Sequence, residues 1–128
     1  MFLPVELLPG ERVVRGILAT RQHTLLSGAL GQLYLTNRRL FWTPLRVNVW
    51  MRLVKEPQVV ALSEIDRCEV GERSVFRGWP ADVYANGSRY RFYVGALWGW
   101  VSHAMRGHTE EWVAAIRQAV KAAKEATE

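Results

Sequence analysis

The chain has 128 residues, with 17 basic and 12 acidic side chains and a net charge of +5. Hydrophobic residues make up 49% and charged residues 23%, a balance typical of a folded globular domain, which excludes wholesale disorder. One cysteine excludes an internal disulfide framework and a cysteine-rich zinc site. We expect a single domain over residues 1–128.

The positive charge lies ahead of the C-terminal segment. Residues 1–109 hold 14 basic and 8 acidic side chains, whereas residues 110–128 hold 3 basic and 4 acidic ones. Such a field favours anionic partners such as lipid headgroups, phosphate or nucleic acid, although a modest net charge also serves solubility.

No stretch of the sequence is long and apolar enough to span a membrane. The longest apolar run, residues 92–101, has ten residues, and a spanning helix needs about 20. The first residues lack the basic region of a secretory signal. We therefore expect no transmembrane segment and a location in the cytoplasm, either free or peripheral at the inner face of the membrane.

Short strands with alternating hydrophobicity fill most of the chain. Strands are predicted over residues 12–20, 29–36, 40–43, 58–62, 65–70, 81–85 and 88–94. Residues 46–54 also alternate and fit a strand or an extended loop. Within the first strand, Gly16 indicates a bulge or a close approach of another group. Pro44 ends the third strand, because proline cannot donate to a central ladder.

Two connections carry clear turn signals. Asn86-Gly87 lies between two alternating runs and predicts a tight hairpin, because both central residues of that turn need a positive φ. Asn37-Arg38-Arg39 predicts a second tight turn, in which asparagine suits a left-handed backbone and the arginines point outward.

A single amphipathic helix is predicted over residues 109–126. Thr109 is the expected N-terminal cap, and Glu110 and Glu111 complement the helix dipole. Seven antiparallel strands followed by one helix fit an open-ended barrel or sandwich that the helix plugs. The predicted core comprises Leu33, Leu35, Phe41, Val60, Leu62, Ile65, Phe92, Val94, Trp112, Ile116 and Val120.

Two motifs go beyond periodicity. Leu8-Pro9-Gly10-Glu11 opens the domain, and residues 31–42 read GQLYLTNRRLFW. Together they resemble the GRAM domain of the pleckstrin-homology-like (PH-like) superfamily, whose pattern is L-P-G-E followed by G-x-L-Y-L-T-N-x-R-L-x-F. Trp42 stands where the family usually has phenylalanine, and residues 60–65 are similar to the family's I-x-L-x-x-I strand and turn.

The resemblance covers nearly the whole chain. It implies a mainly β fold, a PH-like split barrel of about seven antiparallel strands capped by the C-terminal helix. It also implies a small binding or scaffolding module, commonly found at membranes, rather than an enzyme.

Basic residues at two connections form a candidate anion site. The first and third turns of a meander lie at the same end of the sheet. Arg21 and His23 occupy the first turn, and Arg46, Arg52 and Lys55 lie in or beside the third. Arginine binds phosphate through paired hydrogen bonds and lysine binds it as a point charge. Lipid-binding PH domains also carry basic residues in the second strand, and strand 29–36 has none, so a general anionic surface stays open beside a specific headgroup.

Exposed tryptophans are a second candidate contact surface. Trp98 and Trp100 lie in an apolar segment between Arg91 and Arg106, and Trp50 lies on the polar face of residues 46–54. Tryptophan prefers the membrane interface, because its ring is apolar and its N–H is polar. The alternative for Trp98 and Trp100 is packing in the core or against a second subunit, and the alternative for Trp50 is packing by a neighbouring loop or subunit.

The sequence carries no motif for catalysis or for a metal. It has no nucleophile elbow, phosphate loop or zinc-protease motif. Cys68 fits a small buried hydrophobic residue, and His103 and His108 lack further ligands. We expect no enzymatic activity, no metal and no cofactor.

The function predicted from the sequence is a binding module that docks on an anionic membrane surface or on a protein partner. One alternative is a protein-interaction or oligomerisation module without lipid contact. Another is a nucleic-acid-binding barrel that uses the arginines and aromatics of residues 89–93. Six tryptophans in a chain of this length further predict self-association as a homo-oligomer.

Overall fold

The computed structural model describes residues 6–22, 28–44, 57–73, 78–94 and 106–127. These ranges contain seven strands, one short 3-10 helix and one long α-helix. In chain order, the elements are β1 (Val13–Gln22), β2 (Gly28–Thr36), β3 (Arg39–Pro44), β4 (Gln58–Ala61), η1 (Leu62–Glu64), β5 (Ile65–Val70), β6 (Ala81–Ala85), β7 (Ser88–Val94) and α2 (Arg106–Thr127).

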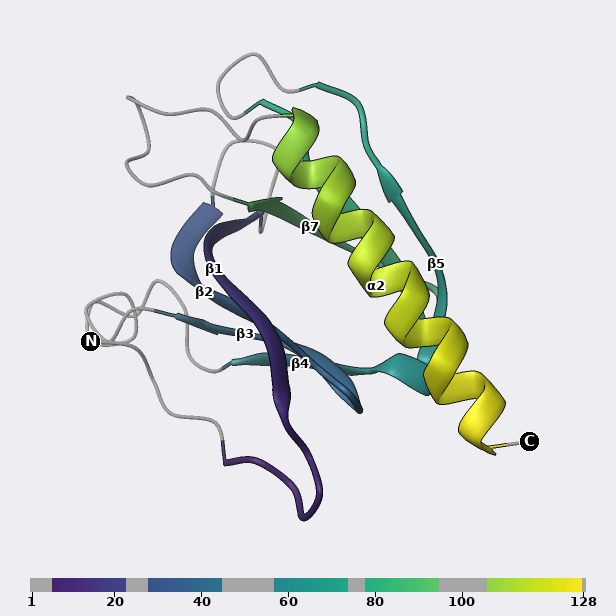
Figure 1. Cartoon of the computed structure of the whole chain (residues 1–128). Helices are drawn as coiled ribbons and strands as arrows, with labels where there is room; N and C mark the ends of the chain where they lie inside the picture. The colour runs from purple at the N-terminus through teal and green to yellow at the C-terminus, as the bar shows by residue number, and fades with distance from the viewer. Residues whose placement is uncertain (1–5, 23–27, 45–56, 74–77, 95–105, 128) are drawn as a thin grey trace.

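The seven strands form one antiparallel sheet in the order β4-β3-β2-β1-β7-β6-β5. The predicted class, an antiparallel sheet of seven strands with one C-terminal helix, is confirmed in the described residues. The sheet is not closed into a barrel, because β4 and β5, its two edge strands, do not pair with each other. They are consecutive in sequence and joined by η1, and α2 runs across the concave side close to β5 (Figure 1).

Helix α2 lies mainly against β5 and η1. The Nε atom of Arg117 donates a hydrogen bond to the carbonyl oxygen of Cys68 at 2.7 Å, so a helix side chain satisfies a backbone group of this edge strand. Trp112, Val113 and Ile116 are the buried apolar side chains on the described part of the helix. The β5 edge of the sheet is thus covered by a helix rather than by a further strand, which is one of the ways folds protect a sheet edge.

The predicted core is confirmed except at Phe41, which is buried outside the core cluster. Ten of its eleven residues are buried and Val120 packs against them partly buried. Phe41 is buried on the other side of the sheet, because Leu40 and Trp42 take the core-facing positions of β3 and alternation sends Phe41 the opposite way. Its ring lies 5.1 Å from that of Tyr34.

The local signals in the strands are confirmed. Asn86 and Gly87 have φ angles of 54° and 77°, as the tight hairpin requires. A Cβ added at Gly16 would lie 3.1 Å from the ring of Tyr34, so this glycine marks a close approach, and the bulge lies earlier, between Val13 and Arg15.

The predicted helix cap is wrong. Helix α2 begins at Arg106, three residues before the expected start, so Thr109 lies inside its first turns. The hydroxyl group of Thr109 is buried and donates to the carbonyl oxygen of Trp79 at 2.8 Å. Threonine serves here as a tertiary link between the helix and the segment before β6.

Candidate functional site

Arg21 is the predicted anion-binding residue that the structure describes. It lies near the end of β1, opposite Ala29 on one side and Phe92 on the other. Since Phe92 faces the core, Arg21 lies on the core-facing side, where its guanidinium group is 5.8 Å from the centre of the Trp42 ring. The Nε1 atom of Trp42 donates to the carbonyl oxygen of Ala19 at 3.0 Å, which fixes the indole beneath the charge.

The electrostatic setting of Arg21 is unusual. Burial lowers the pKa of its guanidinium group, because the charged form loses water. Among the residues that the structure describes, no carboxylate forms an ion pair with it. A partly buried positive charge without a counterion favours binding of an external anion.

Two other partly buried arginines show the contrast. Arg39 is paired with Glu11 at 2.8 Å, and Arg91 is paired with Asp82 at 2.8 Å. Asp82 binds Arg91 through both carboxylate oxygens and raises the pKa of its guanidinium group. These two arginines therefore have internal partners and serve the fold.

The other predicted contact residues lie outside the described residues. These are His23, Arg46, Arg52 and Lys55 of the anion site, and Trp50, Trp98 and Trp100 of the tryptophan surface. Of the predicted anion site, the structure therefore places Arg21 alone. That the other four residues gather around it stays a prediction.

The residues that carry the sequence motifs are joined by a buried polar network that the sequence analysis missed. The side chain of Glu11 is fully buried and accepts hydrogen bonds from Thr36 Oγ1 at 2.7 Å, Arg39 Nε at 2.8 Å and the backbone N–H of Leu8 at 2.9 Å. Burial alone would raise the pKa of Glu11, but the bonds from Arg39 and Thr36 outweigh it and lower the pKa to about 2.

Asn37 completes this network, and its predicted role was wrong. Its backbone is not left-handed. Instead its side chain accepts from the N–H of Arg12 at 2.8 Å and donates to the carbonyl oxygen of Gly10 at 3.2 Å. Arg39 was expected to point outward, yet its side chain is 14% exposed because Glu11 draws it inward. The sequence did carry a signal for this ion pair, because the first motif ends in the acidic Glu11 and the second contains the basic Arg39.

Strand β7 bears on the nucleic-acid alternative. Phe92 is buried and Tyr90 packs against the core, so these rings are turned away from the arginine face, as predicted. Tyr93 shares the face of Arg91 but is 2% exposed. Stacking on bases needs exposed rings, and these three do not supply them.

The groups with reactive or ligating chemistry are separated in the described part of the chain. Cys68 is buried, as predicted, and burial raises the pKa of its thiol to about 12. No group of three or more histidine, cysteine, aspartate or glutamate side chains is placed to hold a metal ion in the described ranges. In the same ranges, no helix is long and apolar enough to cross a bilayer.

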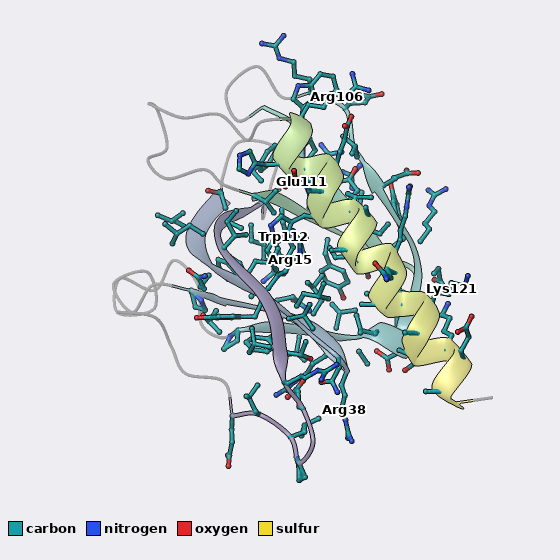
Figure 2. All side chains as sticks on the ribbon, viewed as in Figure 1. Arg15, Arg38, Arg106, Glu111, Trp112 and Lys121 are labelled. Atoms are coloured by element: carbon teal, nitrogen blue, oxygen red, sulfur yellow. The ribbon has the colours of Figure 1, made fainter. Side chains whose placement is uncertain are left out.

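A groove lies between β1 and α2. Its volume is about 590 Å³, and its walls include Arg12 and Arg15 on one side and Ala115 and Ala119 on the other. Figure 2 shows Arg15 on the strand side and Glu111 on the helix side. Its size is that of a site for a small ligand or a short peptide segment.

Comparison with known proteins places the fold. No protein family model matches the sequence, and no curated protein sequence is significantly similar to it. Among solved structures, the Vps36 N-terminal PH domain is similar with a TM-score of 0.63 and 11% identity, covering 96% of this chain and 87% of that chain. The C-terminal domain of an unknown protein from Leishmania infantum has a TM-score of 0.58 at 11% identity, covering 88% of this chain and 87% of that one.

The hSac2 domain from human phosphoinositide phosphatase Sac2 is similar as well. Its TM-score is 0.55 at 12% identity, and the match covers 94% of this chain and 74% of that chain. At these identities the likeness establishes the fold alone. The chain has a PH-like fold.

Proposed function

We propose that this protein is a non-catalytic binding module of the GRAM type that docks on an anionic membrane surface. The observation that carries this proposal is Arg21, a partly buried guanidinium group over the Trp42 ring with no ion pair among the described residues. The other arginines buried to a similar degree, Arg39 and Arg91, each have a carboxylate partner.

A charge in this position suits a phosphate group. The protein has already removed part of the water around Arg21, so an incoming anion meets a donor that is partly desolvated. Arginine offers several N–H groups to one phosphate, and the net charge of +5 attracts an anionic surface over a longer range. The predicted partners of Arg21 in this site remain His23, Arg46, Arg52 and Lys55.

The absence of catalysis is part of the proposal. The single cysteine supports it, because a thiol with a pKa of about 12 is protonated at neutral pH and is a poor nucleophile. Its carbonyl oxygen accepts a hydrogen bond from Arg117, and its buried side chain belongs to the hydrophobic core.

Co-sedimentation with vesicles of increasing phosphatidylserine content, at two salt concentrations, tests the function. Binding should rise with anionic lipid and fall with salt, because each basic residue near the surface contributes about 1 kcal/mol and salt screens it. Arg21→Ala should weaken binding by more than Arg89→Ala, an exposed arginine that serves as the charge-matched control. Arg21→Lys should restore part of the binding, and Arg21→Ala combined with Arg46→Ala and Arg52→Ala should abolish it.

A protein partner is the second candidate function, and the groove between β1 and α2 favours it. Its walls combine small apolar side chains of the helix with charged groups of both signs, Arg12, Arg15 and Glu111, which suits a peptide segment of mixed charge. If the wild-type protein binds no vesicle of any composition, the membrane proposal is wrong and a protein partner becomes the leading candidate. Binding of single-stranded nucleic acid with a steep salt dependence would reject both.

A further inference from the structure

The exposed large hydrophobic residues of the described chain are concentrated at one place. Leu7, Leu8, Val13 and Val14 are 44–53% exposed and flank the turn that leads into β1. Val59 on β4 is the one other such residue in the described ranges, and β4 lies three places from β1 in the sheet. Figure 1 shows the turn before β1 projecting beyond the strands at the lower edge of the view. We call residues 7–14 the docking tip.

The docking tip is held in shape from the inside. Glu11 accepts the N–H of Leu8, and Asn37 donates to the carbonyl oxygen of Gly10. Arg39 donates to the carbonyl oxygen of Glu6, on the other side of the two leucines. Gly10 has a φ of 77°, which closes the turn. A buried charged network therefore fixes a segment whose own apolar side chains point to solvent.

Two exposed arginines, Arg12 and Arg38, lie at the docking tip. A Cβ added at Gly10 would lie 3.4 Å from a terminal nitrogen of Arg38, which places this guanidinium group over the turn. Figure 2 shows Arg38 at the same end of the molecule as the docking tip. Arg12 is exposed on the tip itself. Glu6 is the exposed acid next to them, so positive charge prevails.

Resting on the proposed membrane docking, although at the other end of β1 from Arg21, we infer that the docking tip is the part of this protein that enters an anionic lipid surface, with Leu7 and Leu8 inserted at the level of the headgroups. Apolar side chains on a projecting turn can enter a deformable lipid surface. A protein partner would instead bind in a hollow of this protein or against one of its flat faces. Arg12 and Arg38 complement anionic headgroups, while Leu7 and Leu8 gain apolar burial. These are the two contributions that govern binding at a lipid interface. Rigidity lowers the entropy lost on binding.

The first test is vesicle binding of Leu7→Ala combined with Leu8→Ala. On vesicles with about 30 mol% phosphatidylserine, this variant should bind roughly 10- to 30-fold more weakly, because it loses apolar area that enters the lipid. Val59→Ala, a change of an equally exposed residue, should bind as the wild type does. Arg12→Ala combined with Arg38→Ala should weaken binding and reduce its dependence on salt.

The second test reports insertion directly. Leu8→Cys carrying an environment-sensitive NBD dye should shift its emission to the blue on these vesicles, and Val59→Cys with the same dye should not. The native Cys68 does not interfere, because it is buried and its thiol has a pKa of about 12.

The outcomes separate this inference from the proposed function. Wild-type binding that persists after Leu7→Ala and Leu8→Ala, or a dye at position 8 that stays in water, overturns the docking tip and leaves membrane docking through Arg21. Wild-type protein that binds no vesicle overturns both.

Discussion

In the described part of the chain, Glu11 and Asp82 are the two carboxylates that the fold buries against arginines. The side chain of Glu11 is fully buried and that of Asp82 is 2% exposed, and each receives two hydrogen bonds from its arginine. A buried charge is tolerated when its partner and its hydrogen bonds are complete, and removing one partner then costs more than the pair contributes. At Glu11 the network also joins the turn before β1 to the turn between β2 and β3.

Glu11→Gln should lower the free energy of unfolding by about 2–4 kcal/mol, because Arg39 then lacks its counterion and the amide cannot accept all of the bonds. Denaturant unfolding followed by circular dichroism measures this. Glu125→Gln, an exposed helix residue, is the control and should change stability little. An unfolding free energy for Glu11→Gln within about 0.5 kcal/mol of the wild type would contradict the role of the network.

The same residue predicts an acid dependence of stability. The pKa of Glu11 is lowered from 4.5 to about 2 in the folded state, so its contribution is complete above pH 4.5 and is lost as the pH falls through 2. The difference in unfolding free energy between wild type and Glu11→Gln should therefore shrink from pH 5 towards pH 2. A difference that stays constant over this range would show that ionised Glu11 does not stabilise the fold.

At the scale of elements, the packing of β2 on β3 depends on a glycine. A Cβ added at Gly31 would lie 2.3 Å from the carbonyl oxygen of Thr43 and 2.6 Å from the Trp42 ring. The Trp42 indole, which also carries Arg21, occupies the space that a side chain at position 31 would need. The candidate anion site is thus built on a close approach between two neighbouring strands.

Gly31→Ala should destabilise the domain by about 1–3 kcal/mol, because neither the backbone carbonyl nor the bonded indole can move freely. Gly107→Ala is the matched control with the opposite sign. A Cβ there meets nothing within 4 Å and the residue is helical, so stability should rise by about 0.5–1 kcal/mol. Thermal unfolding of both variants measures these changes in stability. A Gly31→Ala protein that is as stable as the wild type would contradict the close packing of β2 on β3.

At the scale of the whole molecule, the tryptophans fall into two groups, those that the structure describes and those that it does not. Trp42 and Trp112 are buried in the core, and Trp79 is half-buried with the Arg106 guanidinium group 4.9 Å from its ring centre. These three are used inside the domain. Trp50, Trp98 and Trp100 lie outside the described residues, and they are the ones whose surface role the sequence predicts.

We predict that the protein self-associates at micromolar concentration through an apolar surface, since a small binding module gains avidity by presenting two sites to one membrane. Sedimentation velocity should show a species heavier than 14.7 kDa that dissociates on dilution. A single monomeric species across the micromolar range would contradict this prediction and would leave the tryptophans available for lipid.

The sequence by itself determined the elements and the faces of this protein. Alternation placed Phe92 and Val94 in the core, Asn86-Gly87 specified its hairpin, and helical spacing turned Trp112 and Ile116 inward. These are local properties, because a period of two or of 3.6 residues and the φ angle of a turn depend on neighbours along the chain.

The tertiary structure alone decided which distant groups meet. Glu11 and Arg39 are 28 positions apart and become an ion pair through the pairing of β1 with β2, while Thr109 leaves its expected cap because Trp79 offers a carbonyl oxygen. Arg21 gained its importance because no carboxylate in the described chain reaches it. Charge pairing and burial depend on contacts across the sheet, which periodicity does not encode.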